Sequence, residues 1–178
     1  MTILNLHLLG SPVLRQRSVE VPAVDDEVRR FIDDLFETMY AARGVGLAAN
    51  QVGVARRIAV VDAEGDRLVL VNPRIVEASG KHTAEEGCLS VPDLYADVTR
   101  PERVVLEALD RDGAPYRREL DGLAARAVQH EIDHLDGILF LDHLSLLKRT
   151  RLLARWKKEH ERDPSYIREV KPASAGTP

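Results

Sequence analysis

The chain has 178 residues, and its 25 Lys or Arg against 29 Asp or Glu give a net charge of −4. This length suits one domain, and a hydrophobic content of 44% can bury a core, which excludes disorder of the whole chain. The acidic balance argues against a general nucleic-acid binder, and we expect no DNA partner. The single cysteine, Cys88, excludes a disulfide-stapled scaffold. No apolar run suits a membrane span or a signal peptide, so we expect a cytoplasmic protein without membrane contact.

The N-terminal part of the chain predicts one helix. Residues 1–23 carry turn signals and predict irregular structure. From Val24 to Met39, apolar residues recur at spacings of three and four, as on one face of a helix. Asp25 or Asp26 can cap this helix, and Gly44 should end it.

The middle of the chain predicts strands, and helices follow. Arg57–Asp62 and Arg67–Asn72 flank a turn and predict a hairpin. Because the strands follow one another closely, an antiparallel α+β domain is favoured over residues 1–163, with a C-terminal tail at 164–178. The other predicted strands are Arg74–Glu77, Arg103–Asp110 and Tyr116–Leu120, and the other predicted helices are one capped by Asp121 and ended by Asp136-Gly137 and one at Leu144–Arg162.

The second predicted helix carries a metal-binding pattern. Residues 129–135 read QHEIDHL and contain H-E-x-x-H. His130 and His134 are four residues apart and share one helix face, where two imidazoles can hold one cation. Glu131 lies beside them as a potential proton acceptor. Leu123 and Ala127 continue the same stripe as an apolar wall. A catalytic metal site usually has three protein ligands, so one is missing here.

The usual peptidase patterns do not supply the third ligand. In H-E-x-x-H-x-x-G-x-x-H the last position is Phe140, and His143 comes three residues too late. The glutamates further on lie in highly charged sequence and are expected to be solvated. The remaining candidate is Cys88, which lies in the segment EEGCLSVP. It is either a small buried hydrophobe or the ligand that completes a mixed sulfur and nitrogen site with an open fourth position.

A glycine-containing segment follows the first predicted helix. Residues 44–54 read GVGLAANQVGV, and Ala49 replaces the third glycine of a nucleotide-binding fingerprint, so phosphate binding is poorly supported. The bare backbone instead predicts a tight loop that can pair with an extended ligand. Gln51 either satisfies nearby backbone groups or donates its amide to a developing oxyanion.

Three segments together resemble the peptide deformylase family over roughly residues 3–160. They are GVGLAANQ at 44–51, EGCLS at 86–90 and QHEIDHLDG at 129–137, in matching order and spacing. The family removes the N-formyl group from nascent bacterial polypeptides. The resemblance implies antiparallel sheets packed around a central metal-binding H-E-x-x-H helix, with further helices near the N-terminus and the C-terminus. It also implies N-formylmethionyl peptides as substrates and formate as a product.

The resemblance assigns roles to individual residues. It makes Glu131 the general acid and base, which takes a proton from metal-activated water and passes it to the leaving amine. Gln51 and the backbone N–H of Leu89 would hold the oxygen that becomes negative. The implied metal ligands are Cys88, His130 and His134, and the implied substrate-binding residues are Gly44, Val45, Gly46, Leu123, Arg126 and Ala127.

The resemblance further implies an ion pair and a native metal. Glu86, which precedes Gly87-Cys88, is expected to pair with Arg100. One divalent ion per chain is expected. Zn²⁺, Fe²⁺, Co²⁺ and Ni²⁺ all accept cysteine and histidine ligands, and the family resemblance favours Fe²⁺.

The last predicted helix is basic, and other functions stay open. Residues 146–162 hold seven Lys or Arg against two Glu. This segment is either a docked surface helix with a solvated cationic side or, as the resemblance implies, a contact with the ribosome. One alternative function is a zinc endopeptidase, which would cut unformylated peptides and would not need Cys88. Another is a non-catalytic ribosome-binding module with a structural metal.

Overall fold

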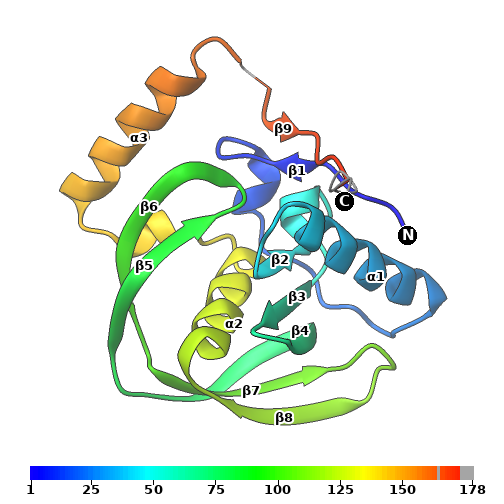
Figure 1. Ribbon diagram of the computed structural model, residues 1–178. Helices are drawn as coiled ribbons and strands as arrows, with labels where there is room; N and C mark the ends of the chain where they lie inside the picture. The colour runs from blue at the N-terminus through cyan, green and yellow to red at the C-terminus, as the bar shows by residue number, and fades with distance from the viewer. Residues whose placement is uncertain (164, 173–178) are drawn as a thin grey trace, which may run out of the picture.

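The computed structural model describes residues 1–163 and 165–172. This part of the chain forms helices and antiparallel sheets (Figure 1). The helices are α1 (Asp26–Ala41), α2 (Gly122–Leu135) and α3 (Leu146–His160), with short 3-10 helices at Pro12–Arg15, Ala49–Val52 and Phe140–His143. The strands are β1 (Leu6–His7), β2 (Gly46–Ala48), β3 (Ile58–Ala63), β4 (Asp66–Ser79), β5 (His82–Cys88), β6 (Val91–Arg100), β7 (Arg103–Leu109), β8 (Pro115–Leu120) and β9 (Ile167–Arg168).

The strands form three separate sheets. The largest has five strands in the order β2-β3-β4-β7-β8. Strands β5 and β6 form a two-stranded hairpin of their own, and β1 pairs with β9. All of these pairings are antiparallel, as the predicted fold class requires.

Strand β3 is buried between two helices. Because successive strand residues point to opposite faces, Ile58 and Val60 face one side of the sheet while Ala59 and Val61 face the other. The first pair packs in one core cluster with α1, and the second pair packs in another with α2. Burial on both faces explains why this strand reads as a continuous apolar run.

Helix α1 begins as the sequence predicts. The side chain of Asp25 accepts a hydrogen bond from the backbone N–H of Val28 at 2.9 Å, so it caps the first turn. The helix ends at Ala41, and the chain turns through Arg43, which has a φ of +58°, into β2. Its buried face is made by Val28, Ile32, Leu35, Phe36 and Met39.

Helix α2 lies between the five-stranded sheet and the β5–β6 hairpin (Figure 1). A third apolar cluster, which includes Val91, Leu94 and Val98 of β6, packs the hairpin against Phe140 and against Trp156 of α3. Strand β5 and helix α2, which carry the candidate metal ligands, lie in contact with each other.

Several predicted elements differ from the structure. Arg74–Glu77 is not a separate strand but the continuation of β4 beyond a register shift. The segment predicted as a glycine loop includes β2, which pairs with β3. Strands β5 and β6 were not predicted. Helix α3 is shorter at both ends than the expected Leu144–Arg162.

The stretch predicted as a tail is described only in part. Within it, β9 pairs with β1, and the backbone N–H of Leu8 donates to the carbonyl of Tyr166 at 2.6 Å. Residues 164 and 173–178 of the predicted tail lie outside the described residues. Among the described residues, no helix has both the length and the apolar character that crossing a bilayer requires.

Candidate active site

Three potential metal ligands converge from two elements. Cys88 ends β5, and His130 and His134 lie one turn apart on α2. One ligand atom from each of these residues lies within 4.8 Å of the other two. The sulfur of Cys88 is 3.2 Å from Nε2 of His134. A thiolate and two imidazoles are a donor set that binds divalent transition metals, so these residues fit the expected ion.

The surroundings shift the pKa values of the two histidines in opposite directions. Burial lowers the pKa of His134 well below its usual value, which keeps the imidazole neutral, as a ligand must be. Burial also opposes protonation of His130, but its hydrogen bonds with Cys88 and Glu86 outweigh this and raise its pKa. Nδ1 of His130 lies 2.9 Å from Oε1 of Glu86, which orients the ring. A carboxylate in this position is a common second partner of metal-binding histidines.

The carboxyl group of Glu131 is buried beside the ligands. Burial raises its pKa to about 7, against the opposing effect of the His130 charge. Its Oε2 atom has no hydrogen-bond partner among the described residues. A carboxyl group with a pKa near neutrality can both take and release a proton, which is what a general acid and base must do.

Gln51 of the 3-10 helix Ala49–Val52 and Leu89, which directly follows Cys88, lie beside the candidate ligands. The side-chain carbonyl of Gln51 accepts from the N–H of Ala48 at 2.9 Å, which fixes the amide. Its Nε2 then donates to Ser90 Oγ at 3.1 Å and lies 3.6 Å from the sulfur of Cys88. Leu89 is the first residue of the two-residue turn between β5 and β6. The backbone N–H at that turn position is not used by the strand ladder and can serve a ligand.

A cleft of about 460 Å³ joins these groups. Gln51, Cys88, Leu89, His130 and Glu131 line it, whereas His134 lies behind them and is only 1% exposed. The substrate-binding residues predicted from sequence all line the same cleft: Gly44, Val45, Gly46, Leu123, Arg126 and Ala127.

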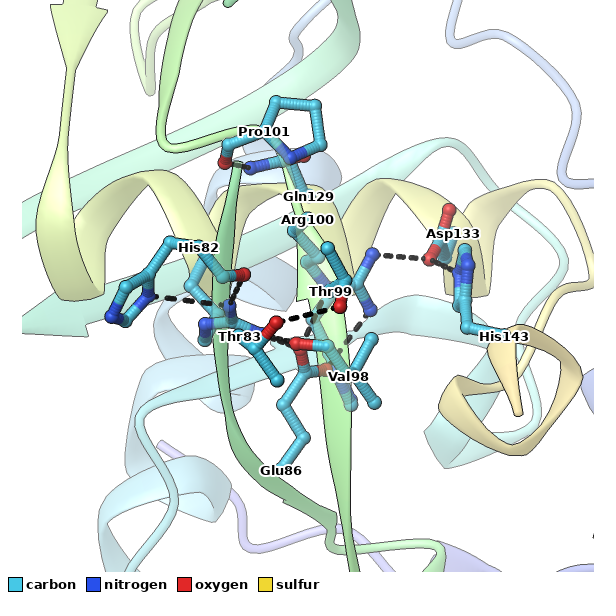
Figure 2. Close-up of polar contacts among 12 residues, drawn as sticks. His82, Thr83, Glu86, Val98, Thr99, Arg100, Pro101, Gln129, Asp133 and His143 are labelled. Atoms are coloured by element: carbon cyan, nitrogen blue, oxygen red, sulfur yellow. Dashed lines mark hydrogen bonds and ion pairs between the residues drawn. The ribbon is translucent and has the colours of Figure 1, made fainter. Parts of the chain in front are cut away.

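Glu86, Arg100 and Asp133 form an ion-pair network beside the candidate ligands (Figure 2). Glu86 and Arg100 form the pair that the sequence predicts, with Nε of Arg100 at 2.7 Å from Oε2 and Nη2 at 2.9 Å from Oε1. Arg100 also donates to Asp133 of α2 at 2.8 Å. Burial opposes ionisation of Glu86, but hydrogen bonds from His130 and Arg100 outweigh it and lower the pKa of Glu86 to about 2. Glu86 therefore stays charged and remains a hydrogen-bond acceptor for His130.

Other residues near the motif have different partners. His143, which comes too late in sequence to be a ligand, has its Nε2 2.7 Å from Asp133 Oδ2 (Figure 2). Asp136 pairs with Arg57 at 2.7 Å. The only group of three or more potential ligands found among the described residues is Cys88, His130 and His134.

The structure adds residues that the sequence analysis did not select. Arg43, Tyr95 and Arg168 also line the cleft. Arg43 directly precedes the glycine motif, so its position in sequence was a usable signal. Arg168 reaches the cleft only because β9 pairs with β1, and no local pattern marks it.

Known proteins are similar to this chain over most of its length. Residues 3–150 match the family described as polypeptide deformylase. A peptide deformylase of Alkalilimnicola ehrlichii is 52% identical over 162 residues, which covers 89% of this chain and 91% of the relative. A peptide deformylase of Brucella suis is 50% identical over 164 residues and covers 89% of this chain and 94% of its own.

Solved structures show the same fold. The crystal structure of a Legionella pneumophila peptide deformylase superposes with a TM-score of 0.83 at 46% identity, covering 92% of this chain and all of that one. The Ehrlichia chaffeensis enzyme in complex with actinonin has a TM-score of 0.87 at 39% identity and covers 93% of this chain and all of its own.

The fold and the site define a metal-dependent hydrolase of the H-E-x-x-H class. The chain belongs to the polypeptide deformylase family. Its activity is that of a deformylase, the hydrolytic removal of the N-formyl group from nascent peptides.

Proposed function

We propose that this chain removes the formyl group from N-formylmethionyl peptides with Cys88, His130 and His134 as metal ligands. The observation that carries the proposal is the convergence of these three ligand atoms within 4.8 Å beside the buried carboxyl group of Glu131. A divalent ion held by these residues would supply Lewis acidity, which lowers the pKa of water. Fe²⁺ is the proposed native ion, and Zn²⁺, Ni²⁺ and Co²⁺ are alternatives that the same ligands accept.

The residues of the chain then carry the proton and the charge. Glu131 takes the proton of the nucleophile and delivers it to the leaving amine. The amide of Gln51 and the N–H of Leu89 hold the oxygen on which negative charge develops, and losing one such donor typically costs about 10²–10³ in rate. Formate and a free N-terminal methionine are the products.

The cleft accounts for substrate recognition in this proposal. The formyl group is small, so selectivity must come from the methionine side chain and the peptide backbone. Val45, Leu123 and Ala127 offer the methionine side chain an apolar wall. Strand β2 is the edge of the five-stranded sheet, so its free edge can add an extended peptide as a further strand.

The decisive test is formate release from a short formyl-Met peptide. The protein would be purified without oxygen and loaded with Fe²⁺, because a thiolate beside ferrous iron is sensitive to oxidation. We expect release by the native chain and none by Glu131→Ala with metal still bound. Absence of release with Fe²⁺, Ni²⁺ and Co²⁺ bound would overturn the proposal.

One substitution separates the deformylase from a zinc endopeptidase. An endopeptidase would not need Cys88, so Cys88→Ser should spare its metal. A deformylase should lose most of its bound metal in this variant, which elemental analysis after dialysis measures directly. Cleavage of unformylated peptides by the native chain would favour the endopeptidase.

A contact with the ribosome is a second proposal, and it favours the cytoplasm as the location. Helix α3 exposes Leu146 and Leu147, which are 72% and 60% exposed. A basic helix on an acidic protein suits local docking to RNA. Co-sedimentation with ribosomes should therefore weaken when Lys157 and Lys158 are replaced by Glu, and equal co-sedimentation would contradict the contact. The cationic side chains of α3 are Lys148, Arg149, Arg151, Arg155, Lys157 and Lys158.

A further inference from the structure

Arg126 connects helix α2 to both strands of the β5–β6 hairpin. It lies on α2 four residues before His130, and it is only 9% exposed. Its Nη2 donates to the backbone carbonyl of His82 on β5 at 2.8 Å. Its Nη1 donates to the backbone carbonyl of Val98 on β6 at 3.0 Å and also to the carboxylate of Glu86. One guanidinium thus holds three acceptors of the hairpin.

The hairpin needs such support because it forms no part of the main sheet. Strands β5 and β6 pair only with each other among the described strands. A two-stranded hairpin by itself is marginally stable in water. The hairpin nevertheless carries Cys88, whose sulfur must stay within reach of two histidines on another element. The contacts that position the hairpin against α2 therefore determine how the three ligand atoms are arranged.

Two arginines, Arg100 and Arg126, cross the junction between the hairpin and α2. Arg100 extends from β6 to Asp133 on α2, and Arg126 extends from α2 to the hairpin. Both reach Glu86, the residue that orients His130. The two arginines balance the carboxylates of Glu86 and Asp133 in charge, and removing one partner from such a buried cluster leaves another charge without compensation.

The bonds of Arg126 to backbone distinguish it from Arg100. Because Arg126 donates to backbone carbonyls of both strands, it fixes the position of the hairpin backbone itself. Only a planar guanidinium with several donors can satisfy these acceptors together, since lysine presents a single charged point.

We infer that Arg126 is a positioning residue that sets the β5–β6 hairpin on α2, so that the thiolate of Cys88 meets the two histidines in a geometry ready for a metal. The inference deepens the proposed function, because it explains how this chain assembles the site assigned there. It also gives Arg126 a role beyond lining the substrate cleft.

The test is metal binding rather than turnover. Arg126→Met keeps much of the side-chain length and removes the donors. We expect it to bind Co²⁺ about 10–100-fold more weakly than the native chain, the usual effect of losing a residue that supports metal ligands. The thiolate-to-cobalt absorption should also weaken or shift, because it reports the sulfur–metal geometry. Arg118→Met, which removes an exposed arginine paired with Asp66, is the matched control and should change neither quantity.

A second variant keeps the test decisive if Arg126→Met does not fold. Arg126→Lys keeps the charge opposite Glu86 but cannot reach both backbone carbonyls at once. We expect weaker Co²⁺ binding and an altered sulfur–cobalt absorption here too, at a smaller magnitude. Native Co²⁺ affinity and absorption in either folded variant would overturn the inference. So would a raised KM for formyl peptide with unchanged metal binding, which would make Arg126 a substrate contact only.

The two proposals fail separately. If the native chain releases no formate, the deformylase proposal falls, while a weaker Co²⁺ complex in Arg126→Lys would still support the role of Arg126. If formate release is normal and both variants bind Co²⁺ as the native chain does, only the role of Arg126 falls.

Discussion

Gly46 lies where a side chain would displace the carboxylate of Glu131. A Cβ built on Gly46 would lie 2.4 Å from Oε1 of Glu131, closer than real side chains allow. The same residue belongs to β2, so its backbone must stay in place to keep the sheet edge. The absence of a side chain at this position therefore protects the proposed general base.

Replacing this glycine should impair chemistry more than folding. We expect Gly46→Ala to lower kcat by about 10²-fold or more, within the range that a general base contributes, with bound metal retained. Formate release and metal content measure both effects. Gly65→Ala is the control: it lies outside the cleft and a Cβ there meets nothing within 4 Å, so the strain that alanine takes on at its φ of +89° should lower stability but leave turnover unchanged. A fully active Gly46→Ala enzyme would show that Glu131 has room to move.

The ionisation of Glu86 should make stability depend on pH. Because the pKa of Glu86 is lowered from 4.5 to about 2, the folded chain favours the carboxylate more than the unfolded chain does. This contribution, about 3 kcal/mol, is present above pH 5 and is lost as the pH falls from about 4.5 to about 2.

Denaturation at several pH values measures that contribution. Urea unfolding of the chelator-treated protein would be compared between the native chain and Glu86→Gln. The difference in the free energy of unfolding should be largest above pH 5 and should shrink toward pH 2. A difference that does not change with pH would mean that Glu86 is not held as a carboxylate.

At the scale of elements, the free edge of β2 predicts how the substrate backbone binds. Gly44, Val45 and Gly46 line the cleft, and β2 pairs with β3 on its other side. An extended peptide added here would exchange backbone hydrogen bonds with this segment.

A peptide with one N-methylated amide should test this edge. Losing one backbone hydrogen bond typically costs about 0.5–1.5 kcal/mol, so KM should rise about 2–10-fold while kcat changes less. N-methylation at the residue that pairs with β2 should show this effect, and N-methylation several residues further along the peptide should not. Equal KM values for all these peptides would argue against strand addition.

At the scale of the whole molecule, a metal held by the three proposed ligands would link two parts that are otherwise joined by packing and ion pairs. The hairpin supplies Cys88, and α2 supplies His130 and His134. A metal that binds the folded state alone stabilises it by about 2.7 kcal/mol at a free concentration of 100 times Kd.

Metal removal should therefore lower the melting temperature. For a domain of this size, that stabilisation corresponds to roughly 5–10 °C in Tm. Calorimetry with saturating Zn²⁺ and after chelation measures the shift, and hydrogen exchange should rise first in β5 and β6 rather than in the five-stranded sheet. An unchanged Tm with metal demonstrably bound would show that the hairpin is held equally well without it.

The strands of the hairpin show why parts of the fold were not predicted from sequence. Segment 82–88 reads HTAEEGC, and its one buried residue is the charged Glu86, so it lacks the alternation of apolar and polar residues that marks a half-buried strand. In β6, Pro92 and Asp93 interrupt the pattern, and Asp93 has a φ of +64°. By contrast, α1 is buried along a regular helical period and β3 is a continuous apolar run, and both were predicted close to their observed bounds.

The sequence by itself determined the chemistry of this protein. The H-E-x-x-H spacing places His130 and His134 on one helix face because the helical period is a local property of the chain. The three motifs in their order indicated the family, and through it the proposed roles of Cys88 and Gln51. Only the tertiary structure decided which groups support them. Arg126 meets carbonyls of His82 and Val98, and Arg168 reaches the cleft through β9. These contacts join segments far apart in sequence, and they depend on how the hairpin, the helix and the chain end pack together, which no local period encodes.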